Sequence, residues 1–268
     1  MNILFCSGVA YKTHTLQEIE EVALSLGYAG LEIMPPPAHL PPDQQQRNTD
    51  YASVRHAPVV HGRGDIYTTD AFKAALDETV IIAKTVGAIT INMHPASRAF
   101  GGRQNVLDGI AYMKEVEAKT EITIAYELLV DPNGVHPDRK QWFAQQQAYD
   151  SIEDWITDVK EYDLAATLDT CHIGTWGRDP EPYIEQVGKN LKHVHFSDFN
   201  TTRKEEHLMP GEGNVHLVPF LRTLNNLHPD ITLTMEISPK NTKEEVEADA
   251  KRSIEYIQQA LLYSGLQV

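Results

Sequence analysis

Short apolar runs, rich in β-branched residues, alternate along the chain with stretches in which apolar positions recur at helical spacing. The short runs predict eight strands, over residues 3–5, 31–33, 54–56, 89–93, 122–126, 165–168, 193–196 and 231–235. The amphipathic stretches predict helices over 16–26, 71–86, 106–119, 152–161, 182–187, 218–227 and 243–262. Prolines at 35–37 and 41–42 predict a long loop after the second strand.

The order of these elements predicts a barrel. A helical crossover between successive strands makes those strands parallel and neighbouring. The strand–helix units are of similar length, and no Gly-x-Gly-x-x-Gly turn follows the first strand, so closure is favoured over an open dinucleotide-binding sheet. We therefore expect residues 1–268 to form one (β/α)8 TIM-barrel domain.

Composition and charge narrow the class of protein. Hydrophobic residues make up 41% and charged residues 23% of the chain, which is typical of a globular protein. No apolar run approaches the ~20 residues of a membrane span, the start does not resemble a signal peptide, and two cysteines make no disulfide framework. We expect a cytoplasmic protein without a membrane partner.

A net charge of −15 argues against unaided binding of nucleic acid. Several basic residues nevertheless follow predicted strands, so a local anion-binding face and simple solvated loop charges both stay open. These residues are Arg63, Arg98, Arg103, Arg178, Arg203 and Lys240.

Imidazole and carboxylate side chains end six consecutive predicted strands. They are His56, His94, Glu127, Asp169, His195 and Glu236. In a TIM barrel the C-terminal ends of the strands form the active-site rim, so these groups should meet there. A single histidine at a strand end is more often structural, but crowded charges are costly without a cation. Because imidazole and carboxylate are common ligands of divalent first-row metals, the joint pattern predicts a metal site.

Residues beside this rim have separate expected roles. His193 points inward one layer below the seventh strand's rim residue, so we expect a hydrogen-bonded structural group. Asp198 would orient a ligand or cap the next element. In the loop-like segment that follows, Glu205 and His207 could fold back as further ligands, whereas we expect Glu206 in solvent.

Three motifs give the chain a resemblance to a known superfamily. It resembles the xylose isomerase-like superfamily, which contains sugar isomerases and epimerases as well as endonuclease IV. The motifs are Asp169-Thr170-Cys171-His172, His195-Phe196-Ser197-Asp198, and His207 followed by Gly211-Glu212-Gly213. The similarity extends from Gly30 to Glu236, nearly the whole chain, but these motifs do not separate the branches.

The isomerase and epimerase branch implies one Mn2+, Co2+ or Mg2+ ion. Its implied ligands are Glu127, Asp169, His195 and Glu236. The implied reaction is proton transfer beside the carbonyl of an open-chain sugar or sugar phosphate through an enediolate, with Glu127 and Glu236 as general base and acid. The implied substrate-binding residues are His172, Arg203 and Arg178. The stretch 128–133 lacks the substrate-binding Glu that ketose 3-epimerases carry there, which argues against a plain ketose 3-epimerase.

The endonuclease IV branch implies three Zn2+ ions and cleavage of DNA at abasic sites. The matching ligand positions are His56, His94, Glu127, Asp169, His172, His195, Glu205, His207 and Glu236. Glu205 stands where that branch has Asp. Two further departures are that His56 is not followed by the aromatic-Leu pair of that branch, and that Leu128 stands where it has Asn.

The sequence favours the isomerase or epimerase over an endonuclease IV-like hydrolase. A dehydratase of keto-inositols on the same barrel and a non-catalytic metal-binding barrel that recognises a carbohydrate or a protein are the remaining alternatives. We expect a carbohydrate substrate from carbohydrate metabolism, and DNA only under the nuclease alternative. The sequence leaves open whether the chain forms a homo-oligomer.

Overall fold

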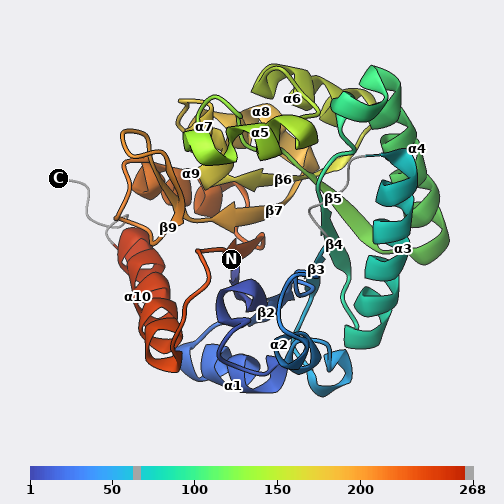
Figure 1. Cartoon of the computed structure of the whole chain (residues 1–268). Helices are drawn as coiled ribbons and strands as arrows, with labels where there is room; N and C mark the ends of the chain where they lie inside the picture. Colours follow the sequence, from blue (N-terminus) through green and yellow to red (C-terminus); the bar gives the residue numbers. More distant parts are fainter. Residues whose placement is uncertain (63–67, 263–268) are drawn as a thin grey trace.

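Eight parallel strands form a closed barrel at the centre of the computed structural model, which describes residues 1–62 and 68–262 (Figure 1). In order around the barrel they are β1 (Asn2–Cys6), β2 (Gly30–Ile33), β3 (Val59–His61), β4 (Thr90–Met93), β5 (Thr123–Glu127), β6 (Ala165–Asp169), β7 (Leu191–Phe196) and β10 (Thr232–Met235). Pairing of β10 with β1 closes the ring. The predicted (β/α)8 TIM barrel is confirmed.

Helices between successive strands cover the outside of the barrel (Figure 1). The predicted ones are α1 (Leu16–Leu26), α3 (Thr69–Val86), α4 (Gly102–Thr120), α6 (Ile152–Glu161), α8 (Glu181–Val187), α9 (Leu217–Leu227) and α10 (Lys243–Leu262). The sequence did not predict three short helices, α2 (Pro42–Arg47), α5 (Pro137–Gln146) and α7 (Thr170–Thr175). Within the described ranges, no helix is long and apolar enough to cross a membrane.

The first helix shows how local sequence sets an element's limits. Thr15 and Glu18 form a capping box, in which each side chain accepts the other residue's backbone N–H. Gly27 ends the helix with φ at 97°, a left-handed conformation that glycine adopts without strain.

The barrel interior becomes polar toward the C-terminal ends of the strands. Large apolar side chains such as Phe72 and Trp155 fill the space between the barrel and its helices, and both are fully buried. Glu32, His193 and Thr234, by contrast, are fully buried polar residues on strands of the barrel itself. Buried polar groups are costly unless they are hydrogen-bonded, so this region is a candidate for function.

The third strand begins at Val59, not at residue 54, so its prediction was wrong. The carboxylate of Glu20 in α1 accepts the backbone N–H groups of Arg55 and His56, at 2.8 and 2.5 Å. Those groups are therefore not available to a neighbouring strand. The side chain of His56 is 55% exposed, and the strand ends at His61 instead.

A small hairpin follows the seventh strand, where the sequence predicted a loop. It consists of β8 (Asp198–Asn200) and the antiparallel β9 (Glu205–Leu208). The carboxylate of Asp198 accepts the backbone N–H groups of Gly211, Gly213 and Val215 at 2.9–3.1 Å. Asp198 thus fixes the loop that returns from the hairpin to the barrel.

Candidate metal centre

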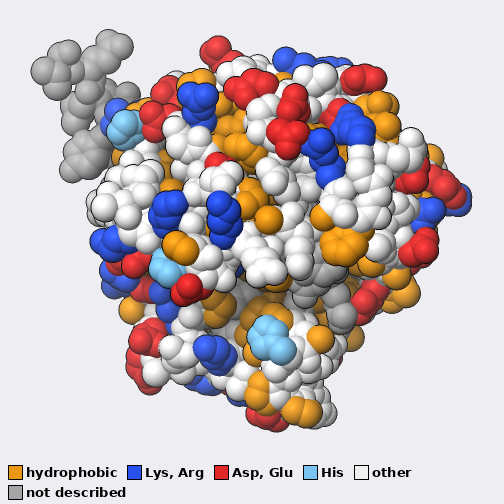
Figure 2. Space-filling view, turned by 45° about the horizontal axis from the view of Figure 1, so that its top comes forward, with side chains coloured by type: hydrophobic (Ala, Val, Ile, Leu, Met, Phe, Trp, Pro, Cys, Tyr) orange, Lys and Arg blue, Asp and Glu red, His pale blue; other side chains and the backbone are white. Residues whose placement is uncertain are grey.

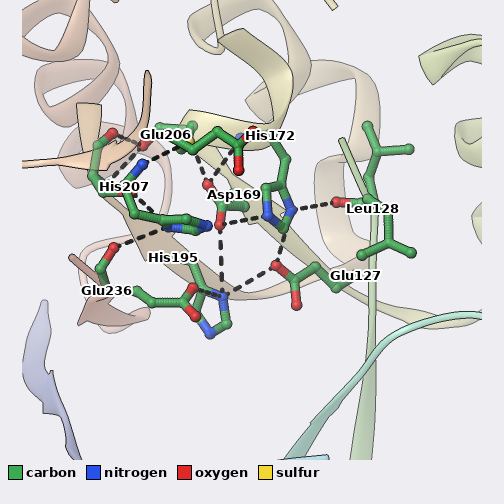
Figure 3. Close-up of polar contacts among 12 residues, drawn as sticks. Glu127, Leu128, Asp169, His172, His195, Glu206, His207 and Glu236 are labelled. Carbon is green, nitrogen blue, oxygen red and sulfur yellow. Dashed lines mark hydrogen bonds and ion pairs between the residues drawn. The ribbon is translucent and has the colours of Figure 1, made fainter. Parts of the chain in front are cut away.

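Four side chains from neighbouring strands converge at the C-terminal end of the barrel (Figure 3). Glu127 ends β5, Asp169 ends β6, His195 lies in β7 and Glu236 follows β10. One possible ligand atom from each lies within 4.8 Å of the others. The Nδ1 atom of His195 is 3.1 Å from Glu127 Oε1 and 2.8 Å from Glu236 Oε2. These are the four residues that the resemblance to the isomerase and epimerase branch implied as one set, and their role as ligands stays a prediction.

The donor set of this group fits a divalent cation. Glu127, Asp169 and His195 are fully buried, and the side chain of Glu236 is 14% exposed. Asp169 Oδ2 accepts no hydrogen bond from the described residues, and Glu236 Oε2 has the ring of His195 beside it, with Nδ1 at 2.8 Å. Buried carboxylate oxygens without a donor are costly, and a cation among them would offset that cost.

The charges of the group depend on one another. Burial alone would raise the pKa of Glu127, but the imidazoles of His195 and His94 hold that pKa well below its usual range. His195 likewise lowers the pKa of Glu236 to about 2 against the effect of burial. Burial lowers the pKa of His195, but Glu32 and Glu236 overcome it and raise this pKa well above the usual value. Without metal, therefore, ionised carboxylates surround a protonated imidazole.

Two further histidines approach Glu127, one at the end of β3 and one directly after β4. The Nε2 atoms of His61 and His94 lie 3.6 and 3.1 Å from Glu127 Oε2. These three residues form a second group whose ligand atoms lie within 4.8 Å of one another. His61 thus occupies the strand-three position to which the sequence assigned His56.

A third group forms around Asp169 with His172 and His207. His172 lies in α7, with its Nε2 atom 3.5 Å from Asp169 Oδ2 and its Nδ1 atom 3.2 Å from Glu127 Oε1. Burial lowers the pKa of His172, but Asp169 and Glu127 overcome it and raise this pKa to about 10. His207 lies in β9, and its ring packs edge-on against that of His172 with 5.4 Å between centroids. The loops after β6 and β7 therefore extend the site beyond the barrel.

Several residues named from the sequence lie outside these groups. Glu205 and Arg203 are both exposed and pair with each other, with 2.7 Å between Oε2 and Nε. Arg178 is exposed after α7. His56 lies beside Glu20, with 3.4 Å between Nδ1 and Oε1. The structure therefore does not bring Glu205 or His56 to the candidate centre.

Glu206 is buried, so its predicted exposure to solvent was wrong. Its side chain is 2% exposed and forms an ion pair with Arg139 of α5. The alternation of side chains along β9 accounts for the difference, since Glu205 points outward and Glu206 inward.

The sequence missed Glu32 in β2. Its fully buried carboxylate contacts two histidines of β7: Oε1 lies 3.0 Å from His195 Nε2, and Oε2 lies 2.9 Å from His193 Nε2. The signal was present, because a charged residue between Leu31 and Ile33 interrupts a strand that is buried on both faces. His193 is the buried, hydrogen-bonded residue that the sequence predicted one layer lower.

Most basic residues that the sequence placed after strands are paired with carboxylates. The pairs are Arg98 with Asp150, Arg103 with Asp158, Arg203 with Glu205, and Lys240 with Asp249. Arg63 lies outside the described residues. On the face in Figure 2, basic and acidic side chains are interspersed. These pairs do not support the anion-binding face that the sequence left open.

Comparison with known families gives one extensive match. A model described as "Xylose isomerase-like TIM barrel" matches residues 21–260. The chain belongs to the xylose isomerase-like TIM barrel family. The expected superfamily is therefore confirmed, and it contains both sugar epimerases and endonuclease IV-like enzymes.

Two curated proteins are similar to this family member. Uncharacterized protein MJ1311 of Methanocaldococcus jannaschii is 29% identical over 102 residues, which cover 37% of this chain and 33% of that protein. This match thus spans about a third of the relative. Uncharacterized protein ML2432 of Mycobacterium leprae is 25% identical over 216 residues, 72% of this chain and 73% of that protein.

Solved structures from both branches of the xylose isomerase-like family share the fold. D-psicose 3-epimerase with D-tagatose from Clostridium cellulolyticum H10 has a TM-score of 0.71 at 14% identity, covering 97% of this chain and 99% of that one. IOLI protein with a zinc atom has a TM-score of 0.71 at 16% identity, covering 97% of this chain and 98% of that one. AP endonuclease, family 2, from Brucella melitensis has a TM-score of 0.65 at 15% identity, covering 91% of this chain and 95% of that one. At these identities the likeness shows the fold alone.

Proposed function

We propose that the chain is a divalent-metal-dependent isomerase or epimerase that moves a proton beside the carbonyl of an open-chain sugar. The observation that carries this proposal is that Glu127 and Glu236 meet around one buried group of potential ligands. Two carboxylates near one reacting carbon can serve as general base and general acid. That sugar epimerases share the fold supports the choice of substrate class.

Glu236 is the better placed of the two carboxylates to take the proton from carbon. Its side chain is 14% exposed, whereas that of Glu127 is fully buried. A substrate can therefore reach an oxygen of the Glu236 carboxylate more readily than one of Glu127. As the Glu236 oxygen accepts the proton, the electron pair of the broken C–H bond moves toward the carbonyl oxygen and gives an enediolate.

Glu127 is the candidate for returning a proton. The imidazole of His172 lies 3.2 Å from Glu127 Oε1, and its raised pKa leaves it protonated at neutral pH. Its Nδ1–H faces both Glu127 Oε1 and the carbonyl oxygen of Leu128, which is 2.8 Å away, so His172 can share this proton with Glu127 or hold a substrate oxygen itself. The exposed Arg178 and Arg203, by contrast, lie outside the buried groups, and Arg203 is already paired with Glu205.

The proposed ligands of the ion are Glu127, Asp169, His195 and Glu236. When bound, a divalent ion polarises the substrate carbonyl and so favours loss of the neighbouring proton. Three carboxylates and one imidazole form an oxygen-rich set, which suits Mn2+, Co2+ or Mg2+ better than Zn2+.

An endonuclease IV-like phosphodiester hydrolase with three Zn2+ ions is the second candidate. Three histidines favour it, namely His61, His94 and His207. They extend the groups of potential ligands around Glu127 and Asp169, and a one-metal enzyme does not require these histidines. The paired arginines argue against it, since DNA phosphates would have to displace carboxylates from those side chains.

Deuterium exchange tests the proposal directly. The protein, stripped of metal and reloaded with Mn2+, Co2+ or Mg2+, is incubated in D2O with a panel of ketoses and aldoses. Nuclear magnetic resonance should show deuterium entering the carbon beside the carbonyl. Glu236→Gln should abolish the exchange, and the exposed Glu205→Gln serves as the matched control with unchanged exchange.

The same protein preparations distinguish the hydrolase from the isomerase or epimerase. The metal content after purification should be near one Mn, Co or Mg per chain, and a zinc-loaded sample should leave an abasic-site duplex intact. Absence of exchange with every sugar and metal would end the isomerase proposal. Incision of the duplex that is lost in His61→Asn and His94→Asn would establish the hydrolase in its place.

A further inference from the structure

The two ring nitrogens of His195 face different carboxylates. Its Nδ1 atom lies among the proposed ligands, 2.8 Å from Glu236 Oε2 and 3.1 Å from Glu127 Oε1. Its Nε2 atom lies 3.0 and 3.1 Å from the two oxygens of Glu32. A neutral imidazole has one N–H and one lone pair, so only one of its two nitrogens can offer a lone pair to a metal ion. If Nε2, which faces Glu32, carries the proton, then Nδ1 can bind a metal ion.

Glu32 reaches His195 across the interior of the barrel. Around the ring, β1 and β10 separate β2, which carries Glu32, from β7. Both oxygens of Glu32 are within hydrogen-bond distance of His195 Nε2, and one also contacts His193 Nε2 at 2.9 Å. The hydroxyl of Thr234 lies 3.2 Å from the same nitrogen of His193. Thr234 thus contacts His193, and His193 contacts the carboxylate that also faces His195.

We propose that Glu32 is a positioning residue of the metal centre, whose carboxylate accepts the Nε2–H of His195 and so presents the Nδ1 lone pair to the ion. This inference rests on the proposed metal site. A carboxylate behind a ligating histidine fixes the tautomer and orientation of the ring and increases the basicity of its other nitrogen. Of the four proposed ligands, Glu32 contacts only His195 among the described residues, so it acts through that ring, although its carboxylate also lies in a group of potential ligands with His61 and His195.

Glu32→Gln tests the role with little change in size. A glutamine removes the negative charge that favours a proton on His195 Nε2, and its side-chain NH2 group would stand where one carboxylate oxygen now accepts from the histidines. Loss of such an outer partner typically weakens metal binding by about 10–100-fold. We expect a loss of that order for Mn2+ binding to the metal-stripped full chain, measured by titration calorimetry. Glu32→Asp, which keeps the charge, should recover part of the affinity.

Thr234→Val is the matched control. It removes the hydroxyl beside His193 Nε2 and takes no hydrogen bond from His195, so Mn2+ affinity should stay within about threefold, well inside the outer-partner effect. A merely structural disturbance of the buried polar layer would instead weaken binding in Thr234→Val as much as in Glu32→Gln, and that result would overturn the proposal.

Nitrogen-15 resonance of the zinc-loaded protein adds a readout that does not depend on affinity. His195→Gln identifies the signals of this ring among those of the other histidines. The wild type should show His195 metal-bound at Nδ1 and protonated at Nε2, and Glu32→Gln should lose or broaden that pattern. If Glu32→Gln does not fold, the same pattern is compared between the wild type and Glu32→Asp, where a shifted Nε2–H signal is expected.

Unchanged Mn2+ affinity and an unchanged tautomer in the Glu32 variants would overturn the positioning role alone. A wild type that binds no divalent ion would instead overturn the metal centre and, with it, the proposed function. The two failures are therefore distinguishable.

Discussion

Arg139 and Glu206 form an ion pair, although 67 residues separate them in the chain. Arg139 lies in α5 after the fifth strand, and Glu206 lies in the hairpin after the seventh. The guanidinium of Arg139 also lies over the ring of Phe143, 4.6 Å from its centroid. Because the same hairpin carries His207, this pair helps to hold His207 near the candidate metal centre.

Arg139→Met should destabilise the fold. The substitution leaves the carboxylate of Glu206, which is 2% exposed, without its cationic partner, and a buried unpaired group typically costs about 1–3 kcal/mol. Arg203→Met is the matched control, because both members of the Arg203–Glu205 pair are exposed and such pairs contribute about 0–1 kcal/mol. Urea unfolding at neutral pH measures both changes in free energy. Equal effects in the two variants would contradict the importance of the buried pair.

The stability of the fold should depend on Glu18 between about pH 2 and pH 5. Lys243 of α10 and the backbone of Thr15 lower the pKa of Glu18 to about 2. A carboxylate with a depressed pKa in the folded state stabilises the fold above its unfolded pKa of about 4.3, and this contribution is lost as the pH falls. The side chain is 46% exposed, so screening limits the effect to about 0.5–1 kcal/mol.

Glu18→Gln isolates this contribution, since glutamine can keep the capping box but not the charge. Urea unfolding of both proteins should show a difference at pH 6 that shrinks toward pH 3. A difference that stays constant over this range would mean that the ion pair with Lys243 contributes nothing to stability.

Metal binding should release protons. Without metal the pKa of His195 is raised well above its usual value and that of His172 to about 10, so both rings are protonated at neutral pH. An ion needs a neutral imidazole, so its affinity should rise with pH. Titration calorimetry in buffers of different ionisation enthalpy counts the protons. A one-metal site requires release from His195, whereas a three-metal site also requires it from His172, and no release at all would contradict the proposed ligands.

The sequence predicted the barrel well because its signal is local and repeated. Every strand–helix unit carries the same change of hydrophobic period, and a capping box and a glycine mark the limits of α1. The third strand failed because the three-residue run at 54–56 resembles a strand. Only the tertiary contact with Glu20, 35 residues earlier, shows that its backbone donors are already used.

The sequence predicted those residues of the candidate site that stand at the ends of strands. Glu127, Asp169, His195 and Glu236 could be named because parallel strands bring their C-terminal ends together. Glu32 could not be placed, since its role arises from a contact across the barrel with a residue 163 positions away. Likewise, the partner of Glu206 is Arg139 of α5, and the apolar pattern of α5 was too weak to predict that helix.

The two oxygens of Asp169 allow its proposed ligand role to be tested apart from its structural one. Asp169 Oδ1 accepts the backbone N–H groups of Cys171 and His172 at the start of α7, whereas Oδ2 has no hydrogen-bond donor among the described residues. Asparagine can keep the first contact through its amide oxygen, but it places an NH2 group where the ion would sit. Asp169→Asn should therefore fold with α7 intact and lose metal-dependent stabilisation.

Thermal unfolding with and without Mn2+ measures this loss. At a concentration about 100 times the dissociation constant, a bound ion stabilises the folded state by about 2.7 kcal/mol. For a chain of this size that corresponds to an increase in Tm of roughly 5–10 °C in the wild type. Glu205→Gln should show the same increase, because Glu205 lies outside the groups, and Asp169→Asn should show almost none. An equal increase in Asp169→Asn would mean that the ion binds elsewhere, since an amide nitrogen cannot replace a carboxylate oxygen as its ligand.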